Sequence, residues 1–85
     1  MASPELKETL EERVCRVVAD VFGLPLAAVS LATSSDTVGN WDSANVLNLL
    51  MAVEAEFGVT LSTDDAADFL SVELIVAILR EWGLG

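Results

Sequence analysis

The fold of this chain is decided by the stretch from Trp41 to Gly58, WDSANVLNLLMAVEAEFG. Its apolar residues recur at spacings of three and four, which predicts an amphipathic helix. Asp42 is a favoured N-cap residue, so we expect Ser43 to be the first helical residue and Gly58 to end the helix. The expected buried face consists of Val46, Leu50, Val53 and Phe57, broadened by Leu47, Leu49 and Met51.

Ser43 in this setting predicts a point of attachment. Trp41, just outside the helix, is expected to pack on Val46 in its first turn as a hydrophobic staple, with Ser43 exposed beside it. A helix N-terminus has unpaired N–H groups and the positive end of the helix dipole, so it tolerates a phosphate. A phosphodiester on Ser43 would lie in that environment, after a long loop where a modifying enzyme can reach it.

A first helix is predicted upstream, from Pro4 to Gly23. Proline is favoured in a first turn, and acidic residues around it complement the helix dipole. Gly23 is expected to cap the C-terminus, and Pro25 prevents the helix from resuming. The following loop is rich in turn residues. Three apolar residues are expected to pin it to the core, namely Leu26, Val29 and Leu31.

Two more helices are predicted downstream. Ser62 or Thr63 is expected to cap a short helical turn that extends through Asp68. Ser71 is expected to cap a last helix that Gly83 ends. Its expected inward-facing residues are Val72, Ile75, Val76, Leu79 and Trp82. The chain is therefore expected to be all-α, a small four-helix bundle of three longer helices and one short helix, forming a single domain over residues 1–85.

Composition limits the classes of partner. The 85 residues include 14 acidic and 4 basic side chains, a formal net charge of −10. Nucleic acid and anionic membranes are unexpected partners, because both are bound through Lys and Arg. Proteins with basic patches are the expected partners, since no cation lies between Arg16 and Arg80. The single Cys15 excludes an intramolecular disulfide, and no leader or membrane-length apolar run is visible, which favours a cytoplasmic protein.

Catalysis by this chain alone is not expected. A serine nucleophile needs a base, usually histidine, to accept its proton, and the sequence has no histidine. Asp64, Asp65 and Asp68 lack the spacing of a calcium loop, and Cys15 is the one soft metal ligand, so no metal site is expected. Cys15 itself is expected to fill the core, as free cysteines often do.

The region from Gly39 to Leu61 resembles the central helix of acyl carrier proteins. Asp42-Ser43 matches the start of the family's Asp-Ser-Leu motif, an aliphatic run follows, and EAEFG at 54–58 matches the family's Glu-x-Glu-Phe-Gly ending of this helix. The surrounding helices also match the family's four-helix order. The resemblance therefore covers nearly the whole chain.

The resemblance implies a function as well as a fold. Ser43 would be esterified with 4′-phosphopantetheine from coenzyme A by a separate phosphopantetheinyl transferase, with Asp42 as the N-cap beside it. The thiol of the arm would hold an acyl or aminoacyl group as a thioester. Loading enzymes and downstream transferases or synthases with basic docking patches would act on that group, while this chain, expected to be a monomer, delivers it.

The sequence departs from the family pattern at three points. Ala44 stands where the family usually has leucine, and Asn45 and Asn48 stand where it often has acidic residues. One extra residue separates Gly39 from Asp42 relative to the commonest spacing. These departures favour a specialised, free-standing carrier over a housekeeping member of fatty-acid synthesis.

Docking residues are predicted from the position of Ser43. Those expected to share its helix face and contact a partner are Ala44, Leu47, Asn48 and Met51. Glu54 and Glu56, further along the helix, are expected to steer the approach electrostatically. The alternative is an unmodified acidic helical adaptor that binds a basic protein partner through the same helix. The two hypotheses differ in one observable, a covalent group on Ser43.

Overall fold

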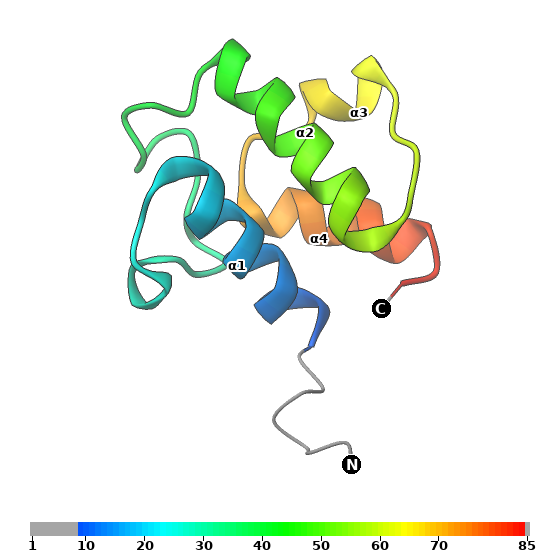
Figure 1. The fold of residues 1–85 in the computed structure, drawn as a ribbon, viewed down its shortest axis with the longest axis horizontal. Coiled ribbons are helices and arrows are strands. Elements are labelled where there is room, and N and C mark those ends of the chain that lie inside the picture. The colour runs from blue at the N-terminus through cyan, green and yellow to red at the C-terminus, as the bar shows by residue number, and fades with distance from the viewer. Residues whose placement is uncertain (1–8, 85) are drawn as a thin grey trace.

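The computed structural model describes residues 9–84, which form a bundle of helices (Figure 1). Its elements are α1 (Leu10–Phe22), the 3-10 turn η2 (Leu26–Ala28), α2 (Ser43–Phe57), α3 (Thr63–Ala67) and α4 (Val72–Glu81). Within the described residues there is no strand, and one isolated β-bridge pairs Ser34 with Ser71. The all-α class, with three longer helices and one short one, is therefore confirmed. None of the described helices combines the length and apolarity needed to cross a membrane.

The start of α1 differs from the prediction. The predicted start at Pro4 lies outside the described residues, and the helix begins at Leu10 because Thr9 is extended and caps it. The Thr9 hydroxyl accepts the Glu12 N–H at 3.1 Å, and the Glu12 carboxylate accepts the Thr9 N–H at 2.9 Å. This capping box satisfies two backbone donors at the start of the helix. Gly23 ends the helix at a φ of 66°, as predicted.

The core is built from the facing sides of α1, α2 and α4. In Figure 1, α2 passes across the bundle, with α1 and α4 below it and α3 beside it. Contacts join α1 to both α2 and α4, whereas α3 packs on α2. The largest fully buried side chains are Val14, Val18, Leu49, Val53, Phe69, Val72, Ile75 and Leu79. Every longer helix contributes to this set, so the three form one continuous core.

Trp41, which lies just before α2, contacts both the end of α1 and the segment between α3 and α4. Its indole is buried and stacks on Phe22, at the end of α1, with ring centroids 4.8 Å apart and planes 21° apart. Its Nε1 donates a hydrogen bond to the Phe69 carbonyl oxygen at 2.8 Å, in the link between α3 and α4. Val46, the predicted staple partner, lies half-buried against the same core. Trp41 is thus anchored from two other elements, which the local staple pattern does not reveal.

The long loop between α1 and α2 is pinned differently from the prediction. Val29 is buried as expected, but Leu26 and Leu31 are exposed. Thr33 and Val38 are buried instead. The Thr33 carbonyl oxygen accepts the Val72 N–H at 3.0 Å, so the loop is held by backbone pairing to the start of α4. A loop without periodicity gives no sign of which apolar residues face inward, and this explains the error.

Trp82 is also placed wrongly by the sequence pattern. The expected inward residues Val72, Ile75, Val76 and Leu79 are buried, whereas 49% of Trp82 is exposed. Trp82 is the C-cap of α4, one residue beyond its last helical residue, Glu81. The helical repeat on which the prediction was based does not continue there.

Replacing Trp41 with phenylalanine tests the anchor. Trp41→Phe keeps an aromatic ring near Phe22 but removes the donor to the Phe69 carbonyl, so we expect the free energy of unfolding to fall by about 1–3 kcal/mol. The measurement is urea unfolding followed by circular dichroism. The matched control is Trp82→Phe, an exposed site where the change should stay within about 0.5 kcal/mol. Equal effects at the two sites would show that the Trp41 hydrogen bond adds nothing.

Candidate functional site at the start of α2

Ser43 is the first residue of α2, and its side chain is exposed. Asp42 precedes it in extended conformation as the N-cap, and its Oδ1 accepts the Asn45 N–H at 3.0 Å. The Asn45 side chain in turn donates to the Asn40 carbonyl oxygen at 2.6 Å, which joins the first turn to the preceding loop. The prediction that Asp42 caps the helix and Ser43 opens it is confirmed. The contact from Asn45 to Asn40 has no sequence signal and was not predicted.

Three serines stand at helix starts, but they have different roles. The hydroxyls of Ser62 and Ser71 cap α3 and α4, accepting the N–H groups of Asp65 and Leu74. At α2 that role belongs to Asp42. Among the described residues, the Ser43 hydroxyl makes no hydrogen bond. It is therefore a hydroxyl at a helix start with no capping role.

The surroundings of Ser43 suit an anionic group. The first N–H groups of a helix have no intrahelical partner and carry the positive end of the dipole. Ser43 is at the first helical position and α2 is 15 residues long, so a phosphate on its hydroxyl would lie at this end. A phosphodiester therefore fits the residues present.

A depression of about 460 Å³ adjoins Ser43, between the start of α2 and α3. Leu47 and Leu70 line it, and both are exposed. The other lining residues are Trp41, Asp42, Ser43, Val46, Thr63, Ala66 and Ala67. Leu70 was not singled out from the sequence, because it follows α3 in a segment without helical periodicity. The surface beside the serine is therefore concave and largely apolar.

One exposed face of α2 carries the predicted docking residues. We call this face the α2 stripe and define it as Ser43, Ala44, Leu47, Asn48, Met51 and Ala55, all of them exposed. Successive helical residues are rotated by about 100°, so these positions fall on one side of the helix. Leu47 and Met51 were also expected to broaden the buried face; that expectation is wrong, since 52% and 62% of them are exposed. The structure thus brings four predicted docking residues together with Ser43.

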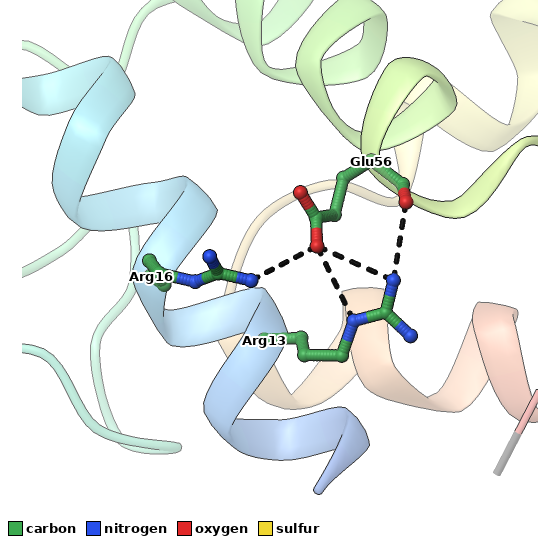
Figure 2. A network of polar contacts seen from close by, with 3 residues as sticks. All are labelled: Arg13, Arg16 and Glu56. Carbon is green, nitrogen blue, oxygen red and sulfur yellow. Dashed lines mark hydrogen bonds and ion pairs between the residues drawn. The ribbon is translucent and has the colours of Figure 1, made fainter. Parts of the chain in front are cut away.

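Glu56 lies apart from the α2 stripe. Figure 2 shows its side chain reaching towards α1, where Oε2 accepts hydrogen bonds from Arg16 at 3.0 Å and from Nε of Arg13 at 3.3 Å. Arg13 also donates to the Glu56 carbonyl oxygen at 3.1 Å and lies over the Phe57 ring, 4.4 Å from its centroid. The carboxylate is therefore neutralised by α1 on the side of the helix away from Ser43.

Glu54 is also engaged within the chain. Its Oε2 accepts the Leu61 N–H at 2.7 Å, so its side chain bends towards the segment that leads to α3. Of the six residues predicted to dock or steer, the structure therefore groups Ala44, Leu47, Asn48 and Met51 as exposed residues. Glu54 lies on the same side of α2, three residues after Met51, but it is partly buried, as is Glu56. A sequence pattern shows that a glutamate is present but not which backbone or side chain it binds.

Cys15 lies on α1, partly buried against the core, in agreement with its expected packing role. Burial raises the pKa of its thiol, and the negative charges of Glu11 and Glu12 raise it further. A raised pKa means that less thiolate is present at a given pH, and the thiolate is the reactive form. Cys15 is therefore a poor nucleophile.

Comparison with known proteins agrees with this site. A family model described as "Phosphopantetheine attachment site" matches residues 12–79. An acyl carrier protein of Nitratidesulfovibrio vulgaris is 29% identical over 72 residues, covering 85% of this chain and 95% of the relative. Acyl carrier protein 2 of Pseudomonas aeruginosa is 34% identical over 74 residues, covering 87% and 94% of the two chains. An acyl carrier protein of Petrotoga mobilis is 32% identical over 75 residues, covering 88% of each.

The chain belongs to the acyl carrier protein family. It carries acyl groups on a covalently attached 4′-phosphopantetheine arm. When bound, the arm supplies a thiol on which the acyl group is held as a thioester. At the start of α2 the chain presents an exposed hydroxyl at a helix N-terminus, beside a concave and largely apolar surface.

The N-cap is tested by removing its carboxylate. Asp42→Ala leaves the Asn45 N–H without its acceptor, so we expect a loss of about 0.5–2 kcal/mol in the free energy of unfolding. Asp42→Asn keeps an acceptor and should retain most of the stability. Asp36→Ala, at an exposed loop position, is the control and should change little. A neutral Asp42→Ala would contradict the capping role.

The Cys15 thiol is tested by alkylation. At pH 8, iodoacetamide should modify Cys15 more slowly in the folded protein than in protein unfolded by urea, because folding raises its pKa and limits access. Mass spectrometry of quenched time points measures the two rates. Equal rates would show that Cys15 is freely accessible.

Proposed function

We propose that Ser43 is the residue to which the phosphopantetheine arm is attached. The single observation that carries this proposal is the position of its hydroxyl, exposed at the first residue of α2 while Asp42 caps the helix. Ser62 and Ser71 are less suitable because their hydroxyls are already used as caps. A phosphodiester on Ser43 would gain from the helix dipole, and the arm would leave the chain beside the depression.

A separate phosphopantetheinyl transferase attaches the arm. The Ser43 hydroxyl must lose its proton when it is esterified, and the chain has no histidine to accept it. The transferase supplies that base. The serine oxygen forms a bond to the phosphorus of the phosphopantetheinyl group, the pyrophosphate bond of coenzyme A breaks, and adenosine 3′,5′-bisphosphate leaves. The chain itself is thus a carrier and not a catalyst. Its contribution is to hold the acyl group at a high effective concentration near a docked enzyme.

The partners are enzymes that must approach Ser43 closely. They include the transferase, an enzyme that loads the acyl or aminoacyl group, and the transferases or synthases that use it. Each meets the α2 stripe, so Ala44, Leu47, Asn48 and Met51 are its contact residues. We place the protein in the cytoplasm, in line with its single cysteine, which excludes an intramolecular disulfide. We expect it to act as a monomer.

The competing function is that of an unmodified acidic adaptor. It would use the same helix but carry no covalent group. The family match and the free Ser43 hydroxyl favour the carrier. Modification of Ser43 separates the two functions.

Intact mass measurement tests the attachment. After incubation with coenzyme A and a broad-specificity phosphopantetheinyl transferase, the mass should rise by one phosphopantetheinyl unit. Ser43→Ala should abolish the gain and leave the helical circular dichroism signal unchanged. Ala44→Leu should speed the reaction, because it restores apolar surface next to the modified residue.

Ser35→Ala serves as the control, since Ser35 is an exposed loop serine and its loss should not affect the gain. A mass gain that persists in Ser43→Ala would place the arm elsewhere. No gain in either the wild type or Ala44→Leu would favour the unmodified adaptor.

A further inference from the structure

We propose that Asn45 is a positioning residue for the attachment reaction, and that it acts by donating its side-chain amide to the backbone ahead of Ser43. The inference rests on the proposed attachment at Ser43. It concerns a half-buried residue two positions after the serine, which does not itself react. The position requires a neutral hydrogen-bond donor, and the amide of Asn45 provides one.

Asn45 binds the segment before α2 at two points. Its backbone N–H donates to Oδ1 of Asp42 at 3.0 Å, and its Nδ2 donates to the Asn40 carbonyl oxygen at 2.6 Å. The two acceptors lie on either side of Trp41 in the chain, and the Trp41 indole is buried in the core. Ser43 lies inside the short stretch that these contacts close, so the backbone that carries the serine is held before and after it.

The contact to Asn40 needs a donor without charge. A carbonyl oxygen only accepts hydrogen bonds, and an ionised carboxylate has no proton to donate. A carboxylate at position 45 would therefore face the Asn40 carbonyl oxygen without a bond. It would also lie close to the Asp42 carboxylate, and like charges repel. In Asn45 the amide oxygen faces the other way, where it accepts Nδ2 of Asn48 at 3.4 Å.

This contact accounts for two departures from the family pattern. The family often has an acidic residue at the position of Asn45, and this chain has one extra residue between Gly39 and Asp42. Asn40, which provides the accepting carbonyl, lies in that longer segment. A longer segment has more conformational freedom, and the amide of Asn45 restricts that freedom close to Ser43.

A restrained serine affects the chemical step. The Ser43 oxygen must align with the phosphorus of the incoming phosphopantetheinyl group while the pyrophosphate bond breaks. A bound transferase can hold this alignment only if the backbone that carries the oxygen is itself held. Correct orientation of reacting atoms contributes strongly to rate. Asn45 is therefore expected to act on the rate constant of modification and not on the affinity for the transferase.

The test is single-turnover modification by a broad-specificity phosphopantetheinyl transferase with coenzyme A. At saturating transferase, Asn45→Ala should lower the rate constant about tenfold, which corresponds to about 1.4 kcal/mol. Asn45→Asp removes the donor and adds a carboxylate beside Asp42, so it should lower the rate constant at least as far. Asn40→Ala is the matched control, because it shortens a side chain but keeps the carbonyl that accepts the bond. Its rate constant should equal that of the wild type.

Amide hydrogen exchange followed by NMR locates the effect in the chain. The Trp41 backbone N–H donates to the Val38 carbonyl oxygen at 3.2 Å, in the segment that Asn45 restrains. Asn45→Ala should speed exchange of this N–H and leave exchange of the Leu50 and Ile75 N–H groups, within α2 and α4, unchanged. Faster exchange at all three groups would show a general loss of stability and would overturn the positioning role.

Three kinetic outcomes would also overturn it while leaving the attachment intact. The first is that Asn45→Ala or Asn45→Asp is modified as fast as the wild type. The second is a defect that only raises the transferase concentration needed for half-saturation, which would make Asn45 a contact residue. The third is equal slowing by Asn40→Ala. If neither the wild type nor Ala44→Leu is modified, the attachment at Ser43 fails, and this inference fails with it.

Discussion

The buried indole of Trp41 fixes the position of α2 and therefore of everything attached to it. Its ring packs on the last residue of α1, and its N–H is bonded to the backbone between α3 and α4. A buried Trp N–H without a partner would be costly, so the Phe69 carbonyl has to remain in place. Because Ser43 follows only two residues later, the same contact that completes the core also places the Ser43 hydroxyl at the surface.

The far end of α2 is held by a second set of contacts from α1. Arg13 and Arg16, near the start of α1, engage Glu56 near the end of α2 (Figure 2). Phe22, at the end of α1, meets Trp41 before the start of α2. The two helices therefore run antiparallel and are joined at both ends. The third arginine of the described chain, Arg80, pairs with Glu11 across α4 and α1. All three described arginines thus contribute to internal pairing, which leaves much of the negative charge unbalanced on the remaining surface.

Sequence predicted the helices well where caps and periodicity agreed. Asp42, Gly58, Ser62 and Ser71 mark boundaries that the structure reproduces, because each acts through backbone groups within a few residues. The predictions from sequence failed where the burial of a residue depends on contacts with residues far away in the chain. The 3-10 turn and loop before α2 gave no periodic signal, so exposed Leu26 could not be distinguished from buried Val38.

Contacts between residues distant in the chain also limited what the sequence could predict about the site. Ser43 and the residues on its face could be predicted, since helical geometry alone groups positions three and four apart. The positions of the glutamate side chains could not, because Glu54 and Glu56 bind groups that are 7 and 40 or more residues away in the chain. Leu70 was missed for a similar reason: it faces the depression through the packing of α3 on α2, which no local pattern records.

The closeness of Trp41 to Ser43 has a mechanical consequence. With the arm attached at Ser43, as proposed, a partner that draws in the arm would pull on the backbone at this residue. The loop before it is long, and a loop of that length would stretch and absorb the pull if it were free. The Trp41 indole is buried in the core two residues away. Its stacking on Phe22 and its hydrogen bond to the Phe69 carbonyl oxygen would transmit the force to α1 and to the segment between α3 and α4. The helices that Trp41 joins would then move together with Ser43.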